Sequence, residues 1–341
     1  MPSLGDFFYT QFLLRIPKPT ASFASKTVVI TGANSGLGKE TAKHIVRLGA
    51  SKVILACRSQ SRGDAAKAEI ESLFPRCTPG TIEAWPLDLE SASSIAAFAQ
   101  RAAKNLPRLD VVINNAGIHG MGSKFKLVYG TEHTLAVNVV GTFLLAIQLL
   151  PILRSTARKH GVDTHMTTVT SALYDAAKYP SPPMPLDKNG EDIFMWFAQE
   201  DRVNQMNQYN LSKLLQIYVL IRLSAQEQQA GSDTQGAEGR VVINSLDPCF
   251  CKTGLGRGLS GPLRVLRVFE AIAARPAEEG SRLVVQAASA GPETHGLYMR
   301  AGKVRAYEPV ALDEAKGAHV WEALSRRLEA LSPGVLSNLA G

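Results

Sequence analysis

Cysteine, long apolar runs and clustered charge are all scarce in this 341-residue chain. Its four cysteines form no CxxC pair and no Cys/His spacing typical of zinc sites, so we expect reduced thiols, no metal and a cytoplasmic location. No uninterrupted run of about 18 apolar residues is present, which predicts that no helix spans a membrane. The net charge of +7 comes from scattered lysines and arginines, so nucleic acid is not an expected partner.

The first 25 residues form an N-terminal extension with a short apolar patch between Phe7 and Ile16. Asp6 is the only charge before this patch, and Pro17-Lys18-Pro19 follows it. A secretory signal peptide has positive charge before its apolar run and small residues after it. The extension therefore fits a short amphipathic helix packed on the domain, with loose contact to a membrane surface left open.

Apolar side chains are abundant, because 45% of the residues are hydrophobic and 20% are charged. From Lys26 onward, short β-rich runs alternate with longer helical patterns. We expect strands at 27–30, 53–56, 82–87, 111–113, 166–170 and 240–245, and helices at 37–48, 62–73, 91–103, 132–153 and 208–228. This alternation predicts an α/β fold with a doubly wound parallel sheet of the Rossmann type, covered by helices on both faces. We place it in one domain over residues 26–311, followed by a helical tail at 312–341.

Two stretches interrupt this alternation. Tyr179 to Asp187 contains four prolines, which neither a helix nor a central strand tolerates, and Gly231 to Gly239 is rich in Gly, Ser and Asp. The sheet pattern resumes after each of them. We interpret them as insertions into the single domain, the first within a larger insertion at about 173–207.

A glycine-rich turn, Thr31-Gly-Ala-Asn-Ser-Gly-Leu-Gly38, joins the first expected strand to the first expected helix. Glycines there let the backbone turn sharply and approach a pyrophosphate, whose charge is stabilised at the helix N-terminus. The strand before the turn and the helix after it are the context that dinucleotide binding requires. We assign to cofactor binding Gly32, Asn34, Ser35, Gly36, Leu37 and Gly38.

The end of the second strand bears on the choice of nicotinamide cofactor. An NAD site usually has an acidic residue about 20 residues beyond the glycines, where it binds the ribose hydroxyls. At this position the chain has Arg58, in Ala56-Cys57-Arg58, and no acidic neighbour in the sequence. An arginine binds a 2′-phosphate that a carboxylate would repel, so we expect NADP(H).

The pattern Tyr-x-x-x-Lys occurs twice, at Tyr174–Lys178 and at Tyr209–Lys213. In a helix such a pair shares one face, so the ammonium lies near the ring and can lower the pKa of a phenol that donates a proton to a developing alkoxide. Tyr209 begins a long amphipathic helix, and rigid elements hold catalytic geometry best. We therefore assign Tyr209 and Lys213 to catalysis and cofactor binding, and expect the earlier pair to be surface residues.

Together, the TGxxxGxG turn, Asp88-Leu89 after the third strand and Asn114-Asn115-Ala116-Gly117 after the fourth resemble the short-chain dehydrogenase/reductase family of the compact type. The resemblance covers about residues 26–300. It implies that Asp88 and Leu89 flank the adenine and that Asn115, Ala116 and Gly117 line the cofactor groove.

The same resemblance implies roles for further residues. Ser171, with Thr170 as the alternative, polarises the substrate carbonyl. Asn138, a polar residue in an apolar helix, holds a proton-relay water beside Lys213. Pro248 and Thr253 match a loop whose threonine contacts the nicotinamide. Cys249 stands where relatives commonly have glycine, and a positive φ at that position would strain the backbone.

The gap of 38 residues between Ser171 and Tyr209 is longer than in many compact relatives. Apolar residues within it either pack on the domain or form a wall over a hydrophobic substrate: Tyr179, Ile193, Phe194, Met195, Trp196 and Phe197. Residues at about 254–275 are expected to form the opposing lid. The strand end Ala56-Cys57-Arg58 and the sequence Tyr209-Asn-Leu-Ser-Lys213 look most like the retinol-dehydrogenase and WW-domain-oxidoreductase branch. The N-terminal Phe/Tyr segment and Val320-Trp321-Glu322 in the tail look like fungal reductases of secondary metabolism.

These observations favour an NADPH-dependent reductase that acts on a ketone or aldehyde of an apolar, polyketide- or terpenoid-like molecule. Oxidation of a retinol-like, steroid-like or secondary-metabolite alcohol is the close alternative. A non-catalytic NADP-binding regulator or scaffold is an alternative of another class. The helices around Asn138 and Tyr209 either pair across a two-fold axis in a homodimer, as relatives often do, or pack in the core of one chain.

Overall fold

The computed structural model describes residues 4–180, 192–232, 239–253 and 272–340. An eight-stranded sheet lies at the centre in the order β10-β9-β8-β7-β4-β1-β2-β3. Its strands are β1 (Thr27–Thr31), β2 (Lys52–Cys57), β3 (Ile82–Pro86), β4 (Val111–Asn114), β7 (Thr164–Val169), β8 (Val241–Asp247), β9 (Tyr298–Arg300) and β10 (Lys303–Arg305). All neighbours pair in parallel except β9 and β10. The doubly wound parallel sheet is confirmed, and the antiparallel edge at β10 adds to it.

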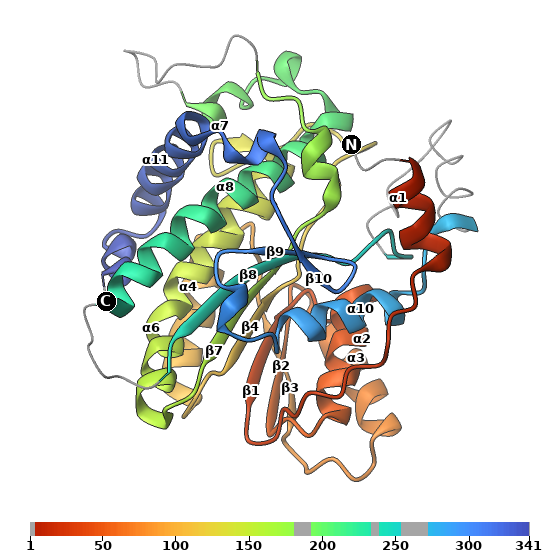
Figure 1. The fold of residues 1–341 in the computed structure, drawn as a ribbon. Helices are drawn as coiled ribbons and strands as arrows, with labels where there is room; N and C mark the ends of the chain where they lie inside the picture. The colour runs from red at the N-terminus through yellow and green to blue at the C-terminus, as the bar shows by residue number, and fades with distance from the viewer. Residues whose placement is uncertain (1–3, 181–191, 233–238, 254–271, 341) are drawn as a thin grey trace.

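Helices cover both faces of the sheet (Figure 1). One face packs against α4 (Ala92–Asn105), α6 (Thr142–His160) and α8 (Gln205–Ser232), and the other against α2 (Gly36–Arg47), α3 (Gln60–Leu73) and α10 (Ala277–Ala287). Each face has its own apolar core, with the central strands between them. Local signals set the helix ends: Ser59 and Ser91 cap α3 and α4 with their hydroxyls, and Gly161 ends α6 in the left-handed conformation.

The helix expected at 132–153 is three consecutive segments, α5 (His133–Leu135), the π-helical η2 (Ala136–Gly141) and α6. By length and composition alone, His133–His160 is apolar enough to cross a membrane. However, 83% of its most apolar window is buried inside the protein. It is the central helix of one core layer, which accounts for its hydropathy.

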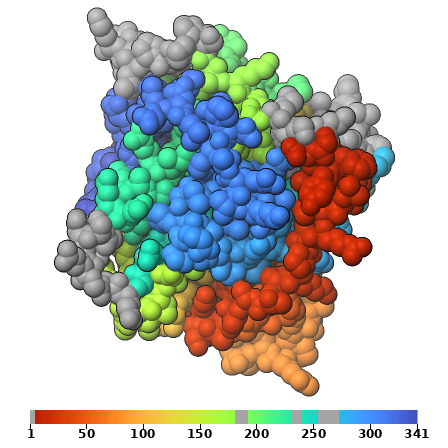
Figure 2. Space-filling view, in the orientation of Figure 1, coloured from red at the N-terminus to blue at the C-terminus, as the bar shows by residue number. Residues whose placement is uncertain are grey.

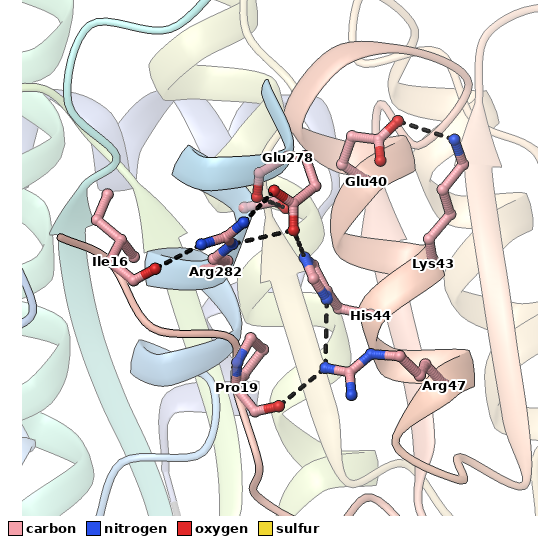
Figure 3. A network of polar contacts seen from close by, with 9 residues as sticks. Ile16, Pro19, Glu40, Lys43, His44, Arg47, Glu278 and Arg282 are labelled. Carbon is pink, nitrogen blue, oxygen red and sulfur yellow. Dashed lines mark hydrogen bonds and ion pairs between the residues drawn. The ribbon is translucent and has the colours of Figure 1, made fainter. Parts of the chain in front are cut away.

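The N-terminal extension lies on the surface beside α10 (Figure 2), where α1 (Leu4–Phe8) continues into the π-helical η1 (Tyr9–Leu13). The expected packing by its apolar face is wrong for η1, because Thr10 and Gln11 are buried and Phe12 and Leu13 are exposed. Arginine side chains hold the chain that follows: Arg47 donates to the Pro19 carbonyl and Arg282 to the Ile16 carbonyl (Figure 3). These hydrogen bonds to the backbone, together with the burial of Ile16 and Phe23, position the extension.

The C-terminal tail is helical, as expected. It contains α11 (Glu314–Leu331), which packs along α8, and the 3-10 turn η9 (Val335–Leu339), which packs on α6. Val320, Leu324 and Leu328 are buried in the core that α6 and α8 share. Arg154 of α6 pairs with Glu227 of α8 at 2.6 Å. The same guanidinium donates to three main-chain carbonyls between 338 and 340, which joins the tail to both helices.

Between β7 and α8, the described residues form three short elements, η3 (Ala172–Ala176), α7 (Ile193–Trp196) and η4 (Glu200–Arg202). Ile193, Phe194 and Phe197 are buried in the domain core, so for these residues packing on the domain is the correct alternative. Tyr179 and Trp196 are half-buried and Met195 is exposed. The remaining small elements are the hairpin β5 (Leu127–Val128) and β6 (Thr131–Glu132), η7 (Pro292–Thr294) and η8 (Pro309–Leu312).

Candidate active site

The loop after β1 and the loop after β4 are joined at the carboxyl edge of the sheet. The Thr31 Oγ1 accepts hydrogen bonds from the backbone amides of Asn115 (3.0 Å) and Ala116 (2.9 Å), and Asn115 Nδ2 donates to the Thr31 carbonyl at 2.8 Å. Gly32 has a φ of +67°. A Cβ at Gly38 would lie only 2.5 Å from Asn115 Nδ2. Glycine is therefore required at both positions, one for its conformation and one for close approach.

This loop leads directly into the N-terminus of α2. Ser35 precedes the helix with an extended backbone, and its side chain makes no capping hydrogen bond. Asn34, Ser35 and Gly36 are half-buried, whereas Leu37 packs into the helix base. A helix start with free amides above a glycine turn fits the pyrophosphate of a dinucleotide.

Arg58 follows β2 and its side chain is 68% exposed, but it has an acidic partner that its sequence neighbourhood does not reveal. Its Nη1 lies 2.8 Å from Glu90 Oε1. Glu90 also binds Lys126 and His133. No acid lies near Arg58 in the sequence, but Glu90 is next to it in the folded chain, so the expectation of an arginine without a nearby acid is wrong. Lys126 adds a second cation beside the same carboxylate.

The two residues after β3 differ in their accessibility. The Asp88 carboxylate is half-buried and accepts a hydrogen bond from the Glu90 amide. Leu89 is 7% exposed and belongs to the apolar core. Its carbonyl accepts a hydrogen bond from the Tyr129 hydroxyl. Leu89 thus supports the floor of the groove from within the core.

The four expected catalytic residues come together at the start of α8. Tyr209 lies in the second turn of this helix, Ser171 follows β7, and their side chains are hydrogen-bonded. The Lys213 ammonium lies 5.5 Å from the centre of the Tyr209 ring. Thr170, the alternative to Ser171, is buried with its hydroxyl bonded to the Leu246 carbonyl. Of these two residues, it is Ser171 that presents its hydroxyl to the phenol.

Asn138 lies in η2 and has protein partners for both side-chain polar atoms. Its Oδ1 accepts from the Ile118 amide, and its Nδ2 donates to the Ile118 carbonyl and to Ser212 Oγ. Ser212 in turn donates to the Tyr209 carbonyl at 2.7 Å. Asn138 therefore joins the loop after β4 to the catalytic helix.

Burial governs the protonation of the catalytic pair. It raises the pKa of the Tyr209 phenol above its ordinary value, and the Asp247 charge raises it further, whereas the Ser171 hydrogen bond lowers it. Burial lowers the pKa of Lys213 to about 7. The nitrogen of Lys213 donates to the Val169 carbonyl at 3.0 Å. A lysine that titrates near neutral pH beside a phenol is typical of a functional site.

We expected the earlier Tyr-x-x-x-Lys pair to lie on the surface, but the structure shows that it is not a surface pair. Lys178 is exposed, but Tyr174 is only 2% exposed and its hydroxyl accepts a hydrogen bond from the Glu308 amide. The two residues lie in and after a 3-10 helix, where residues four apart do not share a face. Tyr174 is a structural residue of the core.

The loop after β8 contains the expected strain. Cys249 has a φ of +66°, a conformation that favours glycine, and it is buried beside Pro248. Thr253 is half-buried and is the last described residue of this loop. Most of the expected lid, residues 254–271, lies outside the described residues.

Two neighbours of the catalytic pair escaped the sequence analysis. The His119 ring stacks on the Tyr209 ring with centroids 4.7 Å apart, and Gln216 accepts a hydrogen bond from Lys213 at 3.1 Å. Gln216 is a lone amide one helical turn after Lys213, so the spacing alone could have identified it. No periodicity points to His119, which lies in an irregular loop.

Comparison with known proteins identifies the family. A model described as short chain dehydrogenase matches residues 26–178. The short chain dehydrogenase/reductase dmxR8 of Cryptosporiopsis sp. is 37% identical over 335 residues, which cover 97% of this chain and 99% of the relative. The chain belongs to the short-chain dehydrogenase/reductase family. The chain is also 35% identical to the short chain dehydrogenase FGM9 of Gibberella zeae, over 96% of its own length and 92% of the relative.

Solved structures agree with the fold. Levodione reductase has a TM-score of 0.59 at 17% identity and covers 87% of this chain and 99% of its own. An NADPH-bound carbonyl reductase from chicken fatty liver has a TM-score of 0.58 at 20% identity, and the match covers 83% of this chain and 100% of the reductase. The family consists of oxidoreductases that bind nicotinamide cofactors, and the glycine turn and helix start described above fit one.

Proposed function

We propose that this protein is an NADPH-dependent reductase of a ketone or aldehyde carried by an apolar, polyketide- or terpenoid-like substrate of secondary metabolism. The observation that carries the proposal is the meeting of Ser171, Tyr209 and Lys213 beside Gly117, which belongs to the loop that supports the glycine turn. A Cβ at Gly117 would lie 3.9 Å from Lys213 Nζ. Catalytic groups and cofactor groove are thus parts of one site.

The residues of the chain divide the reaction between them. NADPH, when bound, supplies the hydride. The Ser171 hydroxyl donates a hydrogen bond to the carbonyl oxygen of the substrate, and the Tyr209 phenol gives its proton to the same oxygen as it becomes an alkoxide. The Lys213 ammonium stabilises the phenolate that remains. The product is an alcohol, with the hydride on carbon and the tyrosine proton on oxygen.

The preference for NADPH rests on Arg58 and Lys126, two cations that flank Glu90 beyond the end of β2. Cations favour a cofactor with an additional 2′-phosphate. The proposal of an apolar substrate is based on the exposed or half-buried apolar side chains of the segment between β7 and α8, which include Leu173 and Trp196. Oxidation of an alcohol by the same residues is the second candidate, because the chemistry runs in both directions.

A non-catalytic NADP-binding regulator is the candidate of another class, and a direct test separates it from an enzyme. Replacing Tyr209 with Phe removes the proton donor and keeps the ring that stacks on His119. We expect Tyr209→Phe to lower NADPH consumption with a panel of apolar ketones by at least about a hundredfold, the lower end for loss of a general acid. NADPH binding, followed by nucleotide fluorescence, should change little.

The native protein and a Tyr174→Phe variant are the controls, since Tyr174 belongs to the earlier Tyr-x-x-x-Lys sequence. Turnover that survives in Tyr209→Phe would reject the assignment of the proton donor. NADPH binding without turnover of any ketone, together with no oxidation of the corresponding alcohols, would favour the regulator. We further propose a cytoplasmic protein whose partner is a small molecule.

A further inference from the structure

Helix α8 directs one more buried polar side chain at the catalytic pair. Gln216 lies one turn after Lys213 and is 1% exposed. Its Oε1 accepts a hydrogen bond from Lys213 Nζ at 3.1 Å, and its Nε2 donates to the main-chain carbonyl of Asn138 at 2.6 Å. A single side-chain amide therefore links the lysine on α8 to the backbone of η2.

We propose that Gln216 is the positioning residue of this site, whose amide takes the place of a water molecule between Lys213 and Asn138. The inference rests on the proposed function and assigns a residue to it. It also replaces the role first given to Asn138, which was to hold a relay water. The side-chain atoms of Asn138 are bound to Ile118 and Ser212, and its carbonyl is bound to Gln216.

The amide fixes the lysine without neutralising it. Lys213 donates to two neutral oxygens, Gln216 Oε1 and the Val169 carbonyl. The titratable groups that face the pair are Tyr209 on the same helix, His119 stacked on the phenol, and Asp247 of β8, whose charge acts on Tyr209. Because its acceptors carry no charge, the ammonium remains free to stabilise a phenolate.

A primary amide also differs from water in what it can pass on. It donates and accepts hydrogen bonds, but it does not release a proton at neutral pH as a hydronium–water pair does. Gln216 can therefore hold Lys213 in place and cannot conduct protons to it from Asn138.

The first test measures the lysine itself in the cofactor-free protein. The pH at which Lys213 titrates is followed by NMR of ¹³C-lysine-labelled protein, and the Lys213→Met variant identifies its signal. Gln216→Glu places a carboxylate on the ammonium and should raise the midpoint by more than one pH unit. Gln216→Met keeps the length of the side chain but removes the acceptor and should lower the midpoint.

The matched control is Gln226→Met, ten residues further along α8, which should leave the midpoint unchanged. Identical midpoints in native protein, Gln216→Glu and Gln216→Met would overturn the proposal. If the methionine variant does not fold, the glutamate variant decides alone, and an unshifted midpoint there rejects the contact.

The second test uses turnover of a ketone that the native enzyme accepts. Gln216→Met should lower kcat about tenfold, the change that accompanies roughly 1.4 kcal/mol of lost transition-state stabilisation, and leave KM for the ketone within about twofold. With the ammonium displaced, the phenol pKa rises, so the alkaline fall of the reductive rate should move to higher pH. A variant with native kcat and a native pH profile would reject the positioning role. If the native protein reduces no ketone, the proposed function fails, while the NMR midpoints of Lys213 still test whether Gln216 positions the lysine.

Discussion

At the scale of single residues, Glu90 controls the charge at the end of β2. It binds Arg58, Lys126 and His133. Burial raises the pKa of Glu90, but its hydrogen bonds to Lys126 and His133 outweigh burial and hold that pKa below its ordinary value. The carboxylate is thus ionised at neutral pH, where it orients the cations and also repels an approaching phosphate.

This arrangement predicts opposite effects of two substitutions on cofactor choice. Arg58→Ala should weaken NADPH binding about tenfold or more relative to NADH, because a charge-assisted contact contributes about 1.5–3 kcal/mol. Glu90→Gln should tighten NADPH, because it removes the repulsion and keeps the size of the side chain. Dissociation constants for both nucleotides, measured by fluorescence titration, check this prediction, with Arg76→Ala as the exposed control. An unchanged NADPH-to-NADH ratio in Arg58→Ala would show that the 2′-phosphate binds elsewhere.

At the scale of elements, arginines on α10 and beside it hold the N-terminal extension by its backbone. The Arg275 guanidinium donates to the carbonyls of Thr10 and Leu14 at 2.6 Å each and pairs with Glu279. Arg282 donates to the Ile16 carbonyl and pairs with Glu278, which also binds His44 of α2 (Figure 3). The segment around residues 10–16 is therefore attached by charge-assisted hydrogen bonds, beside the apolar burial of Ile16 and Phe23.

Loss of one of these arginines should release the extension while the sheet stays folded. We expect Arg275→Ala to speed tryptic cleavage after Arg15 several-fold, because local opening makes this bond accessible. Timed digestion followed by mass spectrometry measures the rate. The control variant Arg158→Ala, an exposed substitution on α6, should be cleaved by trypsin at the native rate. Equal rates in both variants would mean that other contacts hold the extension.

At the scale of the whole molecule, buried histidines couple stability to pH. His44, His165 and His319 lie on α2, β7 and α11, and burial lowers the pKa of each below its ordinary value of 6.5. The unfolded chain therefore binds more protons than the folded chain once the pH falls through that value. Stability is fully present above the unfolded pKa and declines as the pH drops below it.

We expect the free energy of unfolding in urea to be lower at pH 5.5 than at pH 7.5, a range above the titration of the paired carboxylates. His165→Asn should reduce this difference, because it removes one of the groups that must gain a proton. His160→Asn, at the exposed end of α6, should not alter it. A stability that rises toward pH 5.5 would contradict the prediction.

The C-terminal tail affects whether the protein can form a homodimer through α6 and α8. Because α11 packs along α8 and residues 335–339 pack on α6, the tail covers part of the surface of both helices. The homodimer through these helices stays a prediction, and their buried apolar faces fit the core of one chain. Molar mass from light scattering distinguishes the two arrangements.

The sequence by itself determined the features that depend on neighbours along the chain. Alternating apolar runs gave the order of the strands and helices up to β8, with ends close to those observed, because hydrophobic period and caps act over a few residues; α10, β9 and β10 were not predicted. The glycine turn and the Tyr209–Lys213 pair were identifiable for the same reason, since a single turn or helix face contains each of them.

The tertiary structure alone decided which distant groups meet. Arg58 and Glu90 are 32 residues apart, and Gln216 and Asn138 are 78 apart, yet each pair is hydrogen-bonded. The burial of Thr10 in place of Phe12 and the core position of Tyr174 likewise depend on packing against segments far along the chain. Such contacts arise when the fold brings together helices, strands and loops that are distant in the chain, and no local pattern encodes which of their side chains will touch.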